Sequence, residues 1–107
     1  MTEYITVYTT VENEDVAVHV ATALVKERLV ACANITSDMR SIYEWDGIIQ
    51  YDSEVVVVCK TKTHLVDKII ARIKEMHSYD IPCITVSPIT AGNPEYLEWI
   101  SRQVLEA

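Results

Sequence analysis

The stretch that decides the fold is residues 39–61, MRSIYEWDGIIQYDSEVVVVCKT, in which two strand-like segments meet at Asp46-Gly47. Asp-Gly between apolar segments predicts a β-hairpin, because a type I′ turn needs positive φ at both central residues. The segments predict strands over about 39–45 and 48–60, and the second is roughly twice the usual strand length. Its inner half, residues 55–58, is apolar on both faces, which indicates a strand that is covered on both sides.

Composition favours one acidic globular domain. The chain has 107 residues, a net charge of −7 and only two glycines, and half of its residues are apolar. We therefore expect a single domain over 1–107 with a sizeable core. The acidic balance argues against nucleic acid as a partner, since a basic patch is expected there. No apolar run reaches about 18 residues, so we expect no membrane span.

The cysteines and the start of the chain favour the cytoplasm. Cys32, Cys59 and Cys83 each sit in an apolar segment, which is typical of buried thiols in a reducing compartment. No basic region followed by an apolar run opens the chain, so we predict no secretory signal.

The remaining elements follow from periodicity and capping. A helix is predicted from the cap Asn13 to about residue 28, and a second from Thr61 or Thr63 to Met76. A third helix begins after Asn93. The first helix is expected to bury Val16, Val20, Ala23 and Leu24. Strands are predicted over 4–10, 29–35 and 83–87, and a loop over 77–82.

This β-α-β-β-α-β order with a terminal helix predicts an α+β, ferredoxin-like antiparallel sheet with two helices on one face. The strands carry apolar or aromatic residues for both faces, with Tyr4 and Tyr8 opposite Ile5 and Val7. The terminal helix, other subunits or both must cover the second face. We therefore predict a homo-oligomer.

Four local strings carry a resemblance to a known family: ERLVACANI (27–35), SIYEWDG (41–47), CKT (59–61) and YLEWI (96–100). The chain resembles the divalent-cation tolerance protein family, CutA, from end to end. The resemblance implies a ferredoxin-like fold assembled as a homotrimer, with the long hairpins pairing across subunits, similar in architecture to the PII signalling proteins. It also implies an association with copper and other divalent cations.

The family's copper-binding pattern has a cysteine near the end of the first strand and two adjacent histidines after the second helix. In this chain the corresponding positions read Thr9 and Met76-His77, so His77 alone is kept. The resemblance therefore points to a metal site at His77, with Cys83 and Met76 as the nearest soft donors, a set that suits copper. The alternatives are a packing role for Cys83 and a helix-capping role for His77.

A second function remains open, a PII-like signalling trimer that binds a small anionic ligand or a partner protein at subunit interfaces. Lys60 and Thr61 stand where a strand passes to a helix, a place that can hold an anion, and Tyr79 would assist them. No catalytic constellation is recognisable, so we predict no enzyme and no organic cofactor. The aromatic residues near the hairpin turn are predicted to form subunit contacts: Tyr43, Trp45 and Tyr51.

Overall fold

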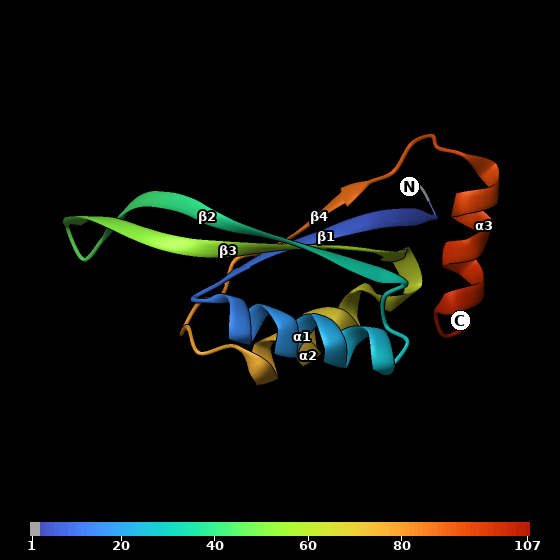
Figure 1. Cartoon of the computed structure of the whole chain (residues 1–107), viewed down its shortest axis with the longest axis horizontal. Helices are drawn as coiled ribbons and strands as arrows, with labels where there is room; N and C mark the ends of the chain where they lie inside the picture. The colour runs from blue at the N-terminus through green and yellow to red at the C-terminus, as the bar shows by residue number, and fades with distance from the viewer. Residues whose placement is uncertain (1–2) are drawn as a thin grey trace.

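The computed structural model describes residues 3–107 and shows one antiparallel sheet with helices against one face (Figure 1). The elements in chain order are β1 (Tyr4–Val11), α1 (Glu14–Lys26), β2 (Cys32–Trp45), β3 (Ile48–Lys62), the short 3-10 helix η1 (Thr63–Leu65), α2 (Val66–Met76), β4 (Ile84–Pro88) and α3 (Pro94–Gln103). The predicted α+β class is confirmed, and the elements follow in the predicted order, with the two strands predicted over 29–35 and 39–45 joined into β2. Residues 1 and 2, at the start of the predicted domain, lie outside the described residues.

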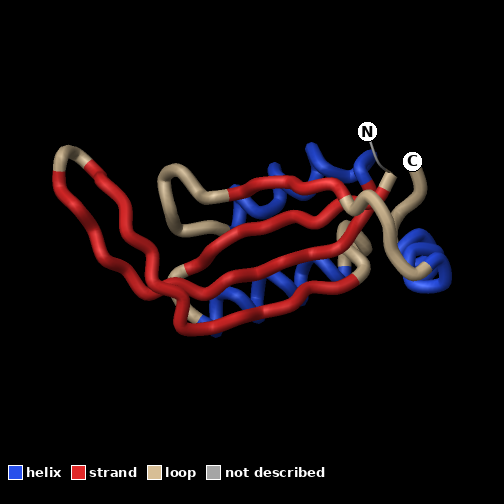
Figure 2. Tube along the Cα trace, turned by 90° about the horizontal axis from the view of Figure 1, so that it is seen from above, coloured by secondary structure: helices blue, strands red, loops and turns tan. Residues whose placement is uncertain are grey.

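The sheet has the strand order β2-β3-β1-β4, and each neighbouring pair is antiparallel. Figure 2 shows the strands from above, with two helices behind them and the β2–β3 arm extending beyond the other strands. The molecule is correspondingly elongated, 45 × 25 × 23 Å. The arm therefore projects from the body of the fold.

The core lies between the sheet and the two helices α1 and α2. Alternate residues of β1 point into it, because successive side chains of a strand face opposite sides. The largest fully buried side chains are Ile5, Leu24, Leu65, Ile69, Ile73 and Ile100. On α1 the buried residues are Ala17, Val20, Ala21 and Leu24. The predicted burial of Val16 and Ala23 is wrong in degree, since both are only half-buried.

The hairpin turn is the one that the sequence predicts. Asp46 and Gly47 have φ values of 51° and 78°, and Trp45 pairs with Ile48. The arm is longer than predicted, because β2 continues through the gap that we expected between strands 29–35 and 39–45. A register shift between Thr36 and Met39 marks a β-bulge, with Asp38 at φ 63°.

The start of the second helix differs from the prediction. Thr61 is not a helix cap; it lies in β3, fully buried, where its hydroxyl donates to the Leu29 carbonyl at 2.7 Å. The chain then passes through η1, which begins at Thr63, before α2. Pairing with β1 continues to Lys62, and this pairing extends β3 past the predicted boundary.

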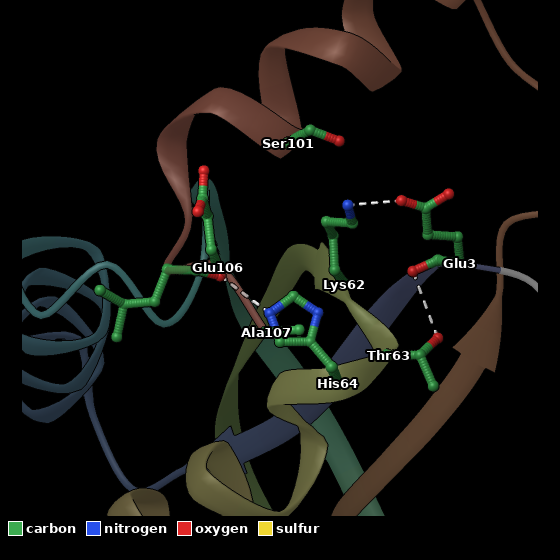
Figure 3. Close-up of a pocket in the computed structure, with 8 residues that line it drawn as sticks. Glu3, Lys62, Thr63, His64, Ser101, Glu106 and Ala107 are labelled. Carbon is green, nitrogen blue, oxygen red and sulfur yellow. Dashed lines mark hydrogen bonds and ion pairs between the residues drawn. The ribbon is translucent and has the colours of Figure 1, made fainter.

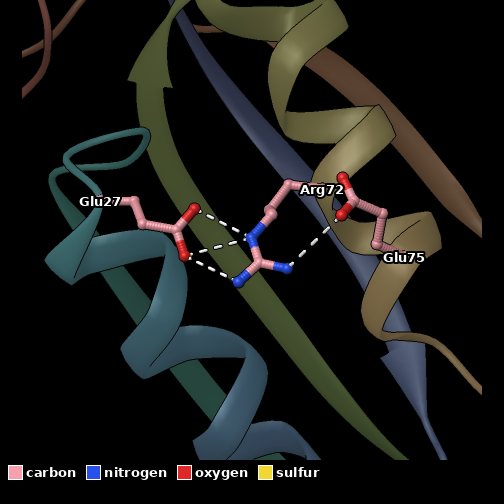
Figure 4. Close-up of polar contacts among 3 residues, drawn as sticks. All are labelled: Glu27, Arg72 and Glu75. Atoms are coloured by element: carbon pink, nitrogen blue, oxygen red, sulfur yellow. Dashed lines mark hydrogen bonds and ion pairs between the residues drawn. The ribbon is translucent and has the colours of Figure 1, made fainter.

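A bidentate ion pair connects the two helices (Figure 4). Arg72 on α2 binds both carboxylate oxygens of Glu27, which follows α1, at 2.9–3.1 Å. The contact lowers the pKa of Glu27, mainly through the hydrogen bond from Arg72. Glu75 lies farther from the same guanidinium, at 3.9 Å.

The terminal helix α3 begins at the predicted cap, where Asn93 Oδ1 accepts from the Glu95 N–H at 3.0 Å. It stands at the end of the sheet remote from the hairpin turn and does not lie along the uncovered face (Figures 1 and 2). Arg28 holds its far end, because the guanidinium donates to the carbonyls of Arg102 and Gln103. The second sheet face, which the helix was one candidate to cover, stays without a helical layer.

Candidate functional site

A pocket of about 550 Å³ lies between the projecting arm and the loop that follows α2. It brings together residues that the sequence placed in different roles. Tyr43 and Trp45 were predicted as interface residues, Tyr79 as an anion-site residue and Cys83 as a metal ligand. The full lining is Thr10, Tyr43, Trp45, Gln50, Asp52, Glu54, Ser78, Tyr79, Asp80, Ile81 and Cys83.

The register of the hairpin, set by the turn at Asp46-Gly47, decides which side chains of the arm reach this pocket. Beyond the bulge Tyr43 pairs with Gln50, so their side chains share a face. Alternation along β3 then puts Asp52 and Glu54 on that face as well. The Ser37 hydroxyl, inside the bulge, donates to Glu14 Oε1 at the start of α1 and ties this irregularity to the helical layer.

Two phenol–carboxylate hydrogen bonds organise the lining. The Tyr43 hydroxyl donates to Asp52 Oδ2 along the arm, and the Tyr79 hydroxyl donates to Glu54 Oε2 at 3.2 Å. Glu54 is only 9% exposed. Among the ion pairs of the described residues, none involves Glu54, so its buried carboxylate has no cation beside it. A buried charge without a counter-charge is costly in free energy.

The pocket is electrostatically negative. Burial, followed by the charge of Glu54, raises the pKa of Tyr79 to about 12. Burial and then Glu54 also raise the pKa of the Cys83 thiol, which therefore stays protonated at neutral pH. The hydrogen bond to Asp52 is the main cause of the raised pKa of Tyr43. Among the described residues that line the pocket there is no Lys, Arg or His. It is suited to a cation and not to an anion.

The predicted metal ligand His77 has both ring nitrogens in hydrogen bonds. Nε2 lies 2.7 Å from the Thr10 carbonyl, to which it must donate, and Nδ1 accepts from the Tyr79 N–H at 3.1 Å. These contacts select the neutral tautomer with the proton on Nε2. In this arrangement His77 holds the loop against the end of β1.

The three predicted metal ligands are not assembled into a preformed site. Met76 packs against the core, His77 is held by the two bonds just described, and Cys83 lines the pocket. Within residues 3–107 no group of three or more His, Cys, Asp or Glu side chains is placed to hold a metal ion. Metal binding at these residues would require the loop to rearrange or another subunit to contribute.

The predicted anion-site residues are also separated. Lys60 Nζ donates to Asn34 Oδ1 at 2.7 Å, and Thr61 is buried against Leu29. Tyr79 contacts Glu54, six residues from Lys60 along β3, which corresponds to roughly 20 Å of extended strand. Within one subunit these three residues do not form a common site.

The third predicted interface aromatic, Tyr51, lies outside the pocket. It is 64% exposed and belongs to a set of exposed apolar side chains on the two faces of the arm. We call this set the arm patch: Ile42, Tyr43, Trp45, Ile48, Ile49 and Tyr51. Side chains of this size are rarely left in water together.

A second hollow, of about 600 Å³, lies beside the C-terminal end of α3 (Figure 3). Lys62 forms an ion pair with Glu3 there, and His64 Nε2 lies 2.8 Å from the Leu105 carbonyl. Ser101 reaches the hydroxyl of Tyr4 at 2.7 Å. These polar groups are hydrogen-bonded or ion-paired with one another, and none of them was predicted as a metal, anion or interface residue.

Asp52 and Glu54 were not singled out from the sequence. On an exposed arm, acidic residues at alternate positions are typical of a solvated strand face. The available signal was the predicted turn, which pairs Tyr43 with Gln50 and so places Asp52 and Glu54 on the face of the aromatic residues. What the sequence did not show is the loop after α2 that closes over this face.

The comparisons with known proteins agree on one family. A sequence model described as "CutA1 divalent ion tolerance protein" matches residues 5–103. The "Divalent-cation tolerance protein CutA" of Thermus thermophilus is 46% identical over 91 residues, covering 85% of this chain and 88% of that protein. The "Protein CutA, chloroplastic" of Arabidopsis thaliana is 40% identical over 92% of this chain, which spans 54% of that longer protein.

A solved structure of CutA1 from Oryza sativa superimposes with a TM-score of 0.96, at 36% identity, covering 99% of this chain and 97% of that one. In the part of the chain that the structure describes, no helix is long and apolar enough to cross a membrane. With the family model matching nearly the whole length and a relative above 45% identity, this chain belongs to the CutA1 divalent ion tolerance protein family.

Proposed function

We propose that this chain acts as a cytoplasmic homotrimer in the response to divalent metal ions, and that copper or another divalent cation binds at the loop after α2. The ligands would be His77, Cys83 and Met76. The observation that supports this proposal is the position of Cys83, whose thiol lines the same pocket as the carboxylates Asp52 and Glu54. A cation approaching the sulfur would find oxygen donors beside it.

Binding at this loop has two costs that follow from the geometry. His77 must give up one of its two hydrogen bonds to expose a ring nitrogen. Cys83 must lose a proton although burial and Glu54 raise its pKa. We therefore expect weak binding that strengthens with rising pH, because the thiolate and the neutral imidazole are the ligating forms.

Calorimetric titration of the reduced protein with Cu(I) and Zn(II) tests the proposal. Wild type is compared with His77→Ala and Cys83→Ser, and His19→Ala serves as the control because His19 is exposed on α1. We expect both loop variants to bind more weakly than wild type and His19→Ala. Identical curves for all four proteins would mean that the loop has only a structural role.

The trimer is supported by the arm patch and by the strand order. Ile42, Ile48 and Tyr51 are each more than 60% exposed in the single chain, and the outer edge of β2 has no neighbouring strand. Both features favour association. The order β2-β3-β1-β4 with α1 and α2 on one face supports the ferredoxin-like arrangement proposed for each subunit.

Sedimentation equilibrium tests the assembly. We expect a trimer at micromolar concentration, and we expect Trp45→Ala to weaken it by about 3–5 kcal/mol per site where a neighbouring subunit encloses the indole. Trp99→Ala is not a suitable control because Trp99 packs against the core. The control is Val18→Ala, because Val18 lies on the exposed face of α1 and its replacement leaves the arm unchanged. A monomeric wild type would refute the proposed trimer.

A second candidate is a PII-like signalling trimer, and the size of the pocket favours it. About 550 Å³ with aromatic walls is within the range of small-molecule sites. The negative lining argues against the anionic ligand that the sequence left open. A signalling role would therefore need a ligand of another charge or a partner protein at the arm.

A further inference from the structure

We infer that the arm pocket binds a protonated organic amine, with its ammonium group at Glu54 and Asp52 and its alkyl part against the aromatic walls. This inference rests on the second candidate function, a ligand-binding trimer, and it names the chemical class of the ligand. It does not depend on metal binding at His77.

The position of Glu54 is the first argument. Its side chain is nearly enclosed, lines the pocket and receives one phenolic hydrogen bond, from Tyr79. A carboxylate has about four acceptor positions, so Glu54 can still accept from an N–H group. A charge-assisted bond from an ammonium ion would supply the missing counter-charge and is stronger than a bond between neutral groups.

The walls supply the second argument. Tyr43, Trp45 and Tyr79 all line the pocket. The face of an aromatic ring attracts a cation, and the attraction is largest for Trp. The same rings cover the alkyl part of an amine, whereas an inorganic cation gains nothing from such walls beyond the ring attraction. Aromatic walls together with the buried carboxylate of Glu54 therefore select an organic cation.

The third argument is the absence of competing charge and of metal geometry. No Lys, Arg or His contributes to the lining, so nothing in it repels a cation or attracts an anion. Among the described side chains no set of three metal-binding groups is assembled. A divalent ion would need the loop after α2 to rearrange before His77 or Met76 could join the pocket, whereas an ammonium ion needs only the hydrogen-bond acceptors already in place.

Isothermal titration with 1,4-diaminobutane tests the inference on the wild-type protein, with tetramethylammonium, zinc and ATP as comparison probes. We expect saturable binding of the diamine, weakened roughly tenfold or more in Glu54→Gln and reduced by added salt. Tetramethylammonium should bind more weakly, since it has no N–H to donate, and ATP should not bind. Glu44→Gln is the matched control, an exposed carboxylate of the same arm outside the lining.

A fluorescence readout at neutral pH separates direct contact from a structural effect. Trp45 lines the pocket, so diamine binding should change the tryptophan emission of wild type and of Glu44→Gln at the same diamine concentrations. Asp52→Asn gives a second variant should Glu54→Gln fail to fold, and it should also weaken diamine binding.

Two results would overturn the inference: no saturable diamine binding to wild type, or equal affinity in wild type and in the folded pocket variants. If zinc binding depends on Glu54 and diamine binding does not, the inference is also overturned and the pocket is assigned to a metal. Sedimentation of the same samples keeps the proposals apart. A trimer that binds no amine refutes only this inference, whereas a monomer refutes the proposed assembly.

Discussion

The Tyr79 hydroxyl on the loop after α2 donates to Glu54 Oε2 on β3 at 3.2 Å. The bond joins the loop to the base of the arm. A second hydrogen bond, from the Tyr79 backbone N–H to His77 Nδ1, holds the backbone of the same residue. Tyr79 is thus held at two points, and its ionisation is coupled to the stability of the loop.

Alkaline pH should destabilise the fold. The pKa of Tyr79 is raised to about 12 by burial and Glu54, and that of Tyr96 to about 12, first by its hydrogen bond to Cys32. Since an unfolded tyrosine has a pKa near 10, the stabilisation is complete below about pH 10 and is lost as pH rises towards 12. Urea midpoints across this range measure the loss. Tyr79→Phe should show a shallower decline than wild type, and parallel declines would contradict the coupling.

Acid should weaken the contact between the two helices. Arg72 lowers the pKa of Glu27, so this contribution is present above the ordinary value of 4.5 and disappears as pH falls through the lower folded value. Glu27→Gln should therefore be less stable than wild type at pH 7, and the difference should shrink as pH falls below 4.5 through the folded pKa of Glu27. The control is Glu75→Gln, whose carboxylate lies at 3.9 Å from Arg72 and should matter less. A Glu27→Gln deficit that persists unchanged in acid would refute the assignment.

Two buried threonines should respond in opposite directions to the same substitution. Thr9 Oγ1 is buried without a hydrogen-bond partner, the one such side-chain atom among the described residues. Thr61 Oγ1 donates to the Leu29 carbonyl. Thr9→Val should raise the free energy of unfolding by about 1 kcal/mol, whereas Thr61→Val should lower it by a similar amount. Chemical denaturation measures both, and equal signs would contradict the hydrogen-bond assignments.

The bulge should be sensitive to the side chain at position 38. Asp38 has φ 63°, a conformation that a β-branched residue adopts only with strain. Asp38→Val should cost about 1–2 kcal/mol of stability, and Asp38→Gly should be neutral or slightly favourable. Thermal unfolding of the two variants makes the comparison. A valine variant as stable as the glycine variant would show that the bulge relaxes without cost.

The parts of the fold set by local chemistry were predictable. Asp46-Gly47 determines a turn through its own backbone preferences, and Asn93 starts a helix through its own side chain. The boundary at Thr61 was not predictable, because pairing with β1 extends the strand through a residue that also suits a cap. Tertiary pairing overrode the local signal there.

The candidate site was predictable only in pieces. Tyr43, Trp45, Tyr79 and Cys83 were each selected, but for separate roles. Their meeting depends on the loop that His77 holds against β1. That is a contact between distant segments, which periodicity does not reveal. For the same reason the sequence grouped Tyr79 with Lys60, which lies far along the strand.

The register shift at Asp38 bears on how this chain is aligned with its relatives. Between the pairs Thr36–Val56 and Met39–Glu54, β2 has two residues and β3 has one. A relative with one residue fewer at this point can pair regularly, because the turn at Asp46-Gly47 still holds Tyr43 opposite Gln50. Since a bulge bends the strand that carries it, a single-residue gap at positions 37–38 marks a straighter arm that keeps the same aromatic wall.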